Sequence, residues 1–180
     1  MRRHLTIAVA CLAIGALSGV AAYDRAGSGT GGWREIAWPF PRDGWPSGRA
    51  FRCDVASCGD EVEIYVRPKI GFCNCDRGVA DDDEVDRVAD LDLLSERFSP
   101  REPGRVVRVA EMPGRMRSYD LVMSDRSRRA ALGIAVSSRC DLLVAVAQGT
   151  SEAPKVQRAA MAFLESPDLK RWMIAALDGR

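Results

Sequence analysis

The chain has 180 residues, of which 47% are hydrophobic, with 26 Lys and Arg against 25 Asp and Glu. This balance of charge excludes the basic field with which nucleic-acid-binding proteins hold phosphates, so no nucleic-acid partner is expected. The length and the hydrophobic content fit one domain with a sizeable core.

The start of the chain has the pattern of an export signal, which we assign to residues 1–22 as a signal peptide or a single-pass anchor. Arg2 and Arg3 form a cationic head, and residues 5–22 are uncharged and mostly apolar. Small residues permit cleavage near Ala22, whereas an uncleaved segment would be the only contact with the membrane. In both cases the sequence predicts a domain outside the cytoplasm, either periplasmic or anchored to the inner membrane.

Cleavage would remove His4, the only histidine of the chain. Ser-His-Asp and Cys-His relays need an imidazole, and so do most catalytic zinc sites. The remaining catalytic alternative is a carboxylate pair of the kind used in glycoside hydrolysis, formed by Glu61, Glu63 or an aspartate near Asp81. We expect no enzyme, no catalytic residue and no cofactor.

Residues 23–32 are rich in Gly, Ser and Thr and predict a flexible tether, followed by a single domain over 33–180. The start of this domain is crowded with aromatic residues, namely Trp33, Trp38, Phe40, Trp45 and Phe51. Such residues together with prolines can line a ligand or peptide groove. The alternative, which we favour, is that they plug one end of a sheet.

Two strands are predicted next, at 49–53 and 61–66. The second alternates polar and apolar residues strictly, which is typical of a sheet with one face in water. A helix is predicted from Asp81 to about Leu94, with aspartates at its N-terminus to cap it and to complement its dipole.

Four further strands are predicted at 106–112, 117–123, 131–137 and 142–147. Turn residues separate them, Pro113-Gly114 in the first pair and Ser138-Arg139 in the second, which predicts two antiparallel hairpins. The chain closes with a helix over 154–165 and another that begins at Ser166-Pro167 and has Trp172 and Met173 on its apolar face.

Strands grouped together with helices set apart predict an α+β domain, with an antiparallel sheet of about six strands and helices packed on it. The aromatic opening strand at 33–40, the hairpins over 106–147 and the closing helices over 154–177 resemble the Mog1/PsbP-like fold of exported bacterial proteins. This resemblance implies a binding or assembly partner rather than an enzyme, although a fold does not determine a function.

The predicted Cys-rich insertion at 53–75 carries Cys53, Cys58, Cys73 and Cys75, which are disulfide candidates in an exported protein. A direct bridge from Cys73 to Cys75 would close a strained ring, so we favour bridges that join the first two cysteines to the last two. The mature chain has an odd number of cysteines, and Cys140 beside a predicted turn is the candidate for the free thiol.

The same four cysteines could instead bind zinc, or copper with help from Met112 or Met116. A strained bond between Cys73 and Cys75 could also serve in redox chemistry. The spacing is not a double Cys-x-x-Cys, so we expect no metal site. The sequence therefore favours an exported, non-enzymatic binding or accessory protein of the envelope, whose partner is another envelope protein or a small ligand. The alternative is a thiol-based metal-binding or redox-accessory protein.

Overall fold

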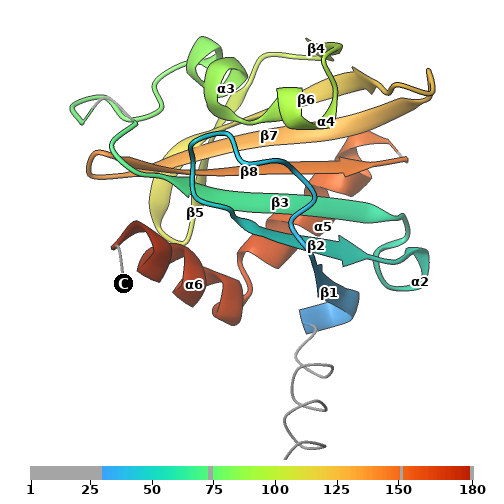
Figure 1. The fold of residues 1–180 in the computed structure, drawn as a ribbon, viewed down its shortest axis with the longest axis horizontal. Coiled ribbons are helices and arrows are strands. Elements are labelled where there is room, and N and C mark those ends of the chain that lie inside the picture. The colour runs from blue at the N-terminus through green and yellow to red at the C-terminus, as the bar shows by residue number, and fades with distance from the viewer. Residues whose placement is uncertain (1–29, 73–74, 151, 179–180) are drawn as a thin grey trace, which may run out of the picture. The chain divides into compact units, whose positions relative to one another are not determined.

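The computed structural model describes residues 30–72, 75–150 and 152–178 (Figure 1). The strands are β1 (Trp33–Ile36), β2 (Arg49–Cys53), β3 (Val62–Lys69), β4 (Phe98–Pro100), β5 (Arg105–Val109), β6 (Met112–Val122), β7 (Arg128–Ser138) and β8 (Asp141–Gly149). The helices are η1 (Thr30–Gly32), α2 (Val55–Cys58), α3 (Asp82–Val88), α4 (Leu91–Leu94), α5 (Ala153–Leu164) and α6 (Pro167–Leu177). The described residues from Gly31 onward belong to one compact unit.

All the described strands join one antiparallel sheet in the order β1-β2-β3-β8-β7-β6-β4, and β5 also pairs with β6. The α+β class is confirmed. The sheet has eight strands, however, and not the predicted six. β1, of four residues, is the start of the predicted opening strand at 33–40, and β4, of three residues, is the strand that the sequence does not predict. A segment of that length is too short to show an alternating pattern in the sequence.

Helices α5 and α6 cover one face of the sheet and contact β3 and β8. Figure 1 shows α6 on one side of the sheet and α3 with α4 on the other. Phe163 of α5 packs against Trp33 and Phe51, with ring centroids 4.3 and 4.8 Å apart. Met173 of α6 is fully buried, whereas Trp172 beside it is only partly buried and lies under the guanidinium of Arg49. Trp172, predicted on the apolar face of this helix, therefore packs against the core cluster without being buried in it.

The opposite face is also covered, by α3, α4 and the segment 37–48. All eight residues of β3 are buried as a result, including the polar ones. The predicted sheet with one wet face is therefore wrong for this strand. Strict alternation in the sequence reports which side chains share a face, but it does not report what covers that face.

The helix predicted from Asp81 is divided in two. Asp81 caps α3 as expected, because its carboxylate accepts a hydrogen bond from the Glu84 N–H at 2.9 Å. Asp90 then adopts a left-handed conformation with φ of 58°, which ends the first helix before α4 begins. Aspartate tolerates this conformation better than most residues, so the break needs no glycine. The hydrophobic pattern therefore does not predict it.

The first predicted hairpin turn is displaced by three residues. The chain reverses at Ala110-Glu111, and Pro113 and Gly114 lie inside β6. Gly114 is needed there for space, because a Cβ on it would lie 2.0 Å from the Ala135 carbonyl oxygen. The second predicted turn, after Ser138, is confirmed.

No helix among residues 30–72, 75–150 and 152–178 is long and apolar enough to cross a membrane. The signal or anchor predicted for residues 1–22 lies outside the described part of the chain, as does the predicted tether up to residue 29.

Candidate functional site

A chain of buried charges runs along β3 on the face covered by α3 and α4. Arg67 and Lys69 point to the same side of the strand and are 3% and 5% exposed. Asp90, at the break between α3 and α4, accepts hydrogen bonds from Arg67 Nε at 2.6 Å and from Lys69 Nζ at 2.6 Å. Asp43 binds the other side of the Arg67 guanidinium with both carboxylate oxygens. Two cations are thus matched by two carboxylates from different segments.

This cluster ties the segment 37–48 and the break between α3 and α4 to the sheet. Burial opposes the charge of Arg67, but the hydrogen bonds to Asp90 and Asp43 outweigh burial and raise its pKa. The hydrogen bond from Arg67 in turn lowers the pKa of Asp43. Lys69 also donates to the Val88 carbonyl and lies near the rings of Trp45 and Phe72. Because every charge in it has a partner, we interpret the cluster as structural.

A second buried polar group lies at the other end of β3. Glu63, which sequence analysis considered as a catalytic carboxylate, accepts hydrogen bonds from Arg52, Tyr65 and Gln148. Burial tends to raise the pKa of Glu63, but these three bonds outweigh it and lower the pKa below its ordinary value of 4.5. A carboxylate held in its ionised form by three donors is a poor general acid.

The other two carboxylate candidates have partners of their own. Glu61 lies 3.8 Å from the same Arg52. Asp81 caps α3, on a different element, with its carboxylate accepting the Glu84 N–H. The three carboxylates are therefore engaged in an ion pair, a buried network and a helix cap.

The lowered pKa values of Glu63 and Asp43 predict a loss of stability in acid. Their folded-state values lie below 4.5 and 3.8, so the unfolded chain binds protons first as the pH falls. The stabilisation is complete above these ordinary values and is lost as the pH falls through the lower folded-state values. We expect the urea midpoint of the parent to decrease as the pH is lowered below about 4.5. The midpoint of Glu63→Gln should decrease less steeply with pH than that of Glu96→Gln, in which an exposed carboxylate is replaced. Parallel curves for the two variants would contradict this assignment.

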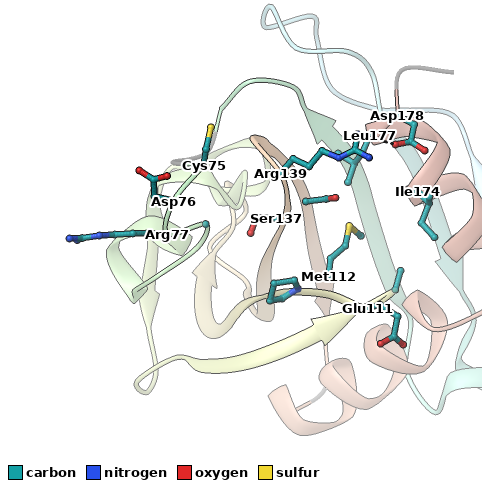
Figure 2. Close-up of a pocket in the computed structure, with 14 residues that line it drawn as sticks. Cys75, Asp76, Arg77, Glu111, Met112, Ser137, Arg139, Ile174, Leu177 and Asp178 are labelled. Atoms are coloured by element: carbon teal, nitrogen blue, oxygen red, sulfur yellow. Dashed lines mark ion pairs between the residues drawn. The ribbon is translucent and has the colours of Figure 1, made fainter.

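A cavity of about 590 Å³ opens at the end of the sheet where the β5–β6 and β7–β8 turns meet the C-terminus of α6 (Figure 2). Apolar side chains on it come from the start of β6 and from α6, namely Met112, Pro113, Ile174 and Leu177. Ile174 is 48% exposed, so it offers apolar surface to this cavity. The segment 75–78 forms the opposite wall.

Charged residues stand around this cavity. Figure 2 shows Asp76 and Arg77 on one side and Ile174 and Asp178 on the other, with the Arg77 side chain directed away from the centre. Arg139, on the β7–β8 turn, reaches toward Asp178, with the nitrogen and oxygen atoms 3.8 Å apart. The cavity thus joins apolar surface to a rim that carries both signs of charge.

The turns that frame the cavity hold unusual backbone. Five non-glycine residues of the described chain have positive φ, and three of them line the cavity: Ala110 at 49°, Glu111 at 66° and Arg139 at 55°. Both turns are two-residue hairpin loops, whose favoured forms require positive φ at one or both positions. The sequence does not predict this cavity, because its lining residues come from separate segments that only the fold brings together.

Two disulfides are present among the described cysteines, and their pairing differs from the prediction. Cys53 is bonded to Cys58, five residues away, and Cys75 is bonded to Cys140, 65 residues away. The expected bridges from the first two cysteines to the last two are therefore wrong, and Cys140 is not the free thiol. Cys73 lies outside the described residues.

The long bridge follows from the sheet. β3 pairs with β8 so that Lys69 lies opposite Leu142, which brings the segment after β3 beside the segment before β8. The Gly71 N–H also donates to the Asp141 carboxylate at 2.6 Å. Cys75 and Cys140 are both exposed, and Cys75 lines the cavity.

The alternative metal site does not survive these bonds. Three of its four proposed ligands, Cys53, Cys58 and Cys75, are in disulfides and have no thiolate to offer. No group of His, Cys, Asp or Glu suited to a metal ion occurs within the described ranges. Met112, one of the proposed copper ligands, lies in the cavity instead.

The aromatic cluster at the start of the domain is divided between the two faces of the sheet. Trp33 and Phe51 belong to the core under α5, as described above. Trp38 and Phe40 pack against Tyr65 on the opposite face, with ring centroids 6.2 and 4.8 Å from it. The predicted plug at one end of the sheet is therefore wrong, because β1 and β2 place Trp33 and Phe51 on one face while the segment 37–48 places Trp38 and Phe40 on the other.

No family model matches the chain, and the comparison with curated proteins finds no match. Among solved structures, the chain is similar to the solution structure of cyanobacterial PsbP (CyanoP) from Synechocystis sp. PCC 6803. The TM-score is 0.39 and the identity 14%, over 77% of this chain and 91% of that one. The expected resemblance to a PsbP-like protein is thus found, and at this TM-score it supports no statement about ligand or partner.

Proposed function

We propose that the protein is an exported, non-enzymatic binding or accessory protein of the envelope, and that the cavity of Figure 2 is its binding site. The observation that carries the proposal is a concave site with apolar side chains and a charged rim, framed by two hairpin turns and the end of α6. Its volume of about 590 Å³ lies within the range of about 300 to 1,000 Å³ that is usual for ligand pockets.

The cavity suits a ligand that presents an apolar group. Met112, Ile174 and Leu177 offer apolar contact, while Glu111 and the pair of Arg139 with Asp178 offer polar contacts at the edge. Binding is the function that this arrangement supports best.

Export is supported by the two disulfides. Such bonds persist in oxidising compartments and are rare in reducing ones. We expect a reporter that is active only outside the cytoplasm, fused after Arg180, to be active, because the cationic head and the apolar residues 5–22 direct the domain outward. A silent fusion, with an active cytoplasmic reporter at the same position, would contradict export.

The cavity can be tested with a neutral apolar dye, N-phenylnaphthylamine, whose fluorescence rises when it enters an apolar site. We expect saturable binding to the parent protein and a loss of affinity of about tenfold or more in Ile174→Lys. The reason is that burying an aliphatic side chain against a ligand contributes about 1.5 to 3 kcal/mol, and each 1.4 kcal/mol is a factor of ten.

Val106→Lys is the matched control for this experiment. Val106 is also an exposed aliphatic residue, at 73%, but it does not line the cavity. We expect its affinity for the dye to equal that of the parent. Equal affinity in all three proteins, or an equal loss in both variants, would place the dye elsewhere and overturn the assignment of the site.

A further inference from the structure

A second cavity, of about 490 Å³, lies away from the first, between the β4–β5 connection, β6 and the start of α5. Its lining is rich in arginine, with Arg101, Arg105 and Arg158 facing one carboxylate residue, Glu102. Neither the proposed function nor the buried charges of β3 involve these residues. The chemistry of this second cavity therefore requires its own explanation.

The three arginines differ in what already binds them. Arg101 donates to the Asp120 carboxylate at 2.7 Å, so its charge is matched. Arg105 donates to the amide oxygen of Gln157 at 2.5 Å, which leaves its charge unmatched. Within the described chain, Arg158 has no hydrogen-bonding or ion-pair partner. Two guanidinium groups beside the cavity therefore lack a carboxylate partner among the described residues.

Ser118 provides a buried hydroxyl at the same place. It is 5% exposed and lines the cavity, and its hydroxyl hydrogen-bonds to none of the described residues. Its register partner on β7 is Leu132, which belongs to the core under α5, so the Ser118 side chain points to the α5 side, where the cavity lies. The Ser118 oxygen is not among the enclosed unpartnered atoms of the described residues, so it is open to the cavity and can bond to an acceptor there.

The start of α5 forms another part of the wall, through Ala153 and Pro154. This helix has 12 residues, and the side chain of its N-cap residue, Glu152, makes no capping hydrogen bond. The N-terminus of a helix carries partial positive charge and favours anions. It therefore adds to the field of the arginines.

From these three features we propose that the second cavity binds a phosphate group. Arg105 and Arg158 would hold its oxygens with their guanidinium groups, and the Ser118 hydroxyl would donate from the floor. The donors come from several directions, which suits the three peripheral oxygens of a phosphate better than the two of a carboxylate. Glu102, on the rim, repels the anion and limits its affinity.

The test is calorimetric titration of the full mature chain with inorganic phosphate, and with glycerol phosphate as a phosphate monoester. We expect saturable binding of at least one of the two, and Arg158→Gln to lose affinity by about tenfold or more, as removal of a hydrogen bond to a charged group does. Glu102→Gln should bind more tightly than the parent. If only the monoester binds, the natural ligand is a phosphorylated molecule, and if inorganic phosphate binds equally well, the phosphate group alone is recognised.

Arg34→Gln is the control, because this substitution removes the same charge from an exposed residue that lies outside the cavity. It should bind phosphate as the parent does. Ser118→Ala, which removes only the hydroxyl, should weaken binding without unfolding the protein. Absence of saturable binding, equal affinity of acetate and phosphate, or equal losses in Arg158→Gln and Arg34→Gln would each overturn the proposal.

Discussion

Replacing both Cys75 and Cys140 by Ser is expected to lower the free energy of unfolding by about 4 kcal/mol, measured by urea denaturation. The bridge closes a loop of 65 residues, so it removes much conformational freedom from the unfolded chain. Both sulfurs are at exposed residues, so little packing is lost with them. The decrease in the free energy of unfolding therefore comes from the loss of the cross-link itself.

The pair Cys53 and Cys58 provides the comparison. Its bridge joins residues only five apart, for which the same relation predicts about 2 kcal/mol. Cys58→Ser alone breaks this bridge and should show the loss due to the cross-link. Cys53 is fully buried, so Cys53→Ser should lose packing energy in addition. If the double replacement at Cys75 and Cys140 left the urea midpoint unchanged, the long bridge would not be present in the folded protein.

Asp90→Asn is expected to cost about 3 to 5 kcal/mol, because it removes one charge from a buried ion cluster and leaves its partners unpaired. Arg67 and Lys69, both almost fully buried, would then face each other with only Asp43 to balance them. Asparagine has nearly the same size and tolerates the left-handed backbone at this position, so the loss comes from the charge.

Asp120→Asn is the matched control at the surface. Asp120 pairs with Arg101 at 2.7 Å, but both side chains are close to half exposed. Such a pair contributes about 1 kcal/mol or less. Similar urea midpoints for the two variants would show that the β3 cluster is as open to water as the surface pair, and would contradict the burial described above.

The sequence pattern was sufficient for the elements whose signals are local. Alternation located β3, turn residues separated the segments of β7 and β8, and Asp81 and the Ser166-Pro167 pair marked the starts of helices. Each of these depends on residues within one turn or one strand. The α+β class followed from their order.

The features that the sequence did not predict depend on contacts between distant segments. The bridge from Cys75 to Cys140 exists because β3 pairs with β8, a pairing that no spacing of cysteines reveals. The buried charges of β3 became visible only when segment 37–48 and Asp90 were placed over them. The cavity of Figure 2 is likewise made by turns that meet in space, from residues without a shared motif.

The central claim, that the cavity of Figure 2 is the binding site, is tested most directly by amide chemical-shift mapping of N-phenylnaphthylamine on the mature, oxidised protein. The predicted result is a set of saturating shifts at Met112, Ile174 and Leu177 and at the turns around Glu111 and Arg139, with the rest of the sheet unchanged. Shifts that gather away from these residues, or that do not saturate, would contradict the claim.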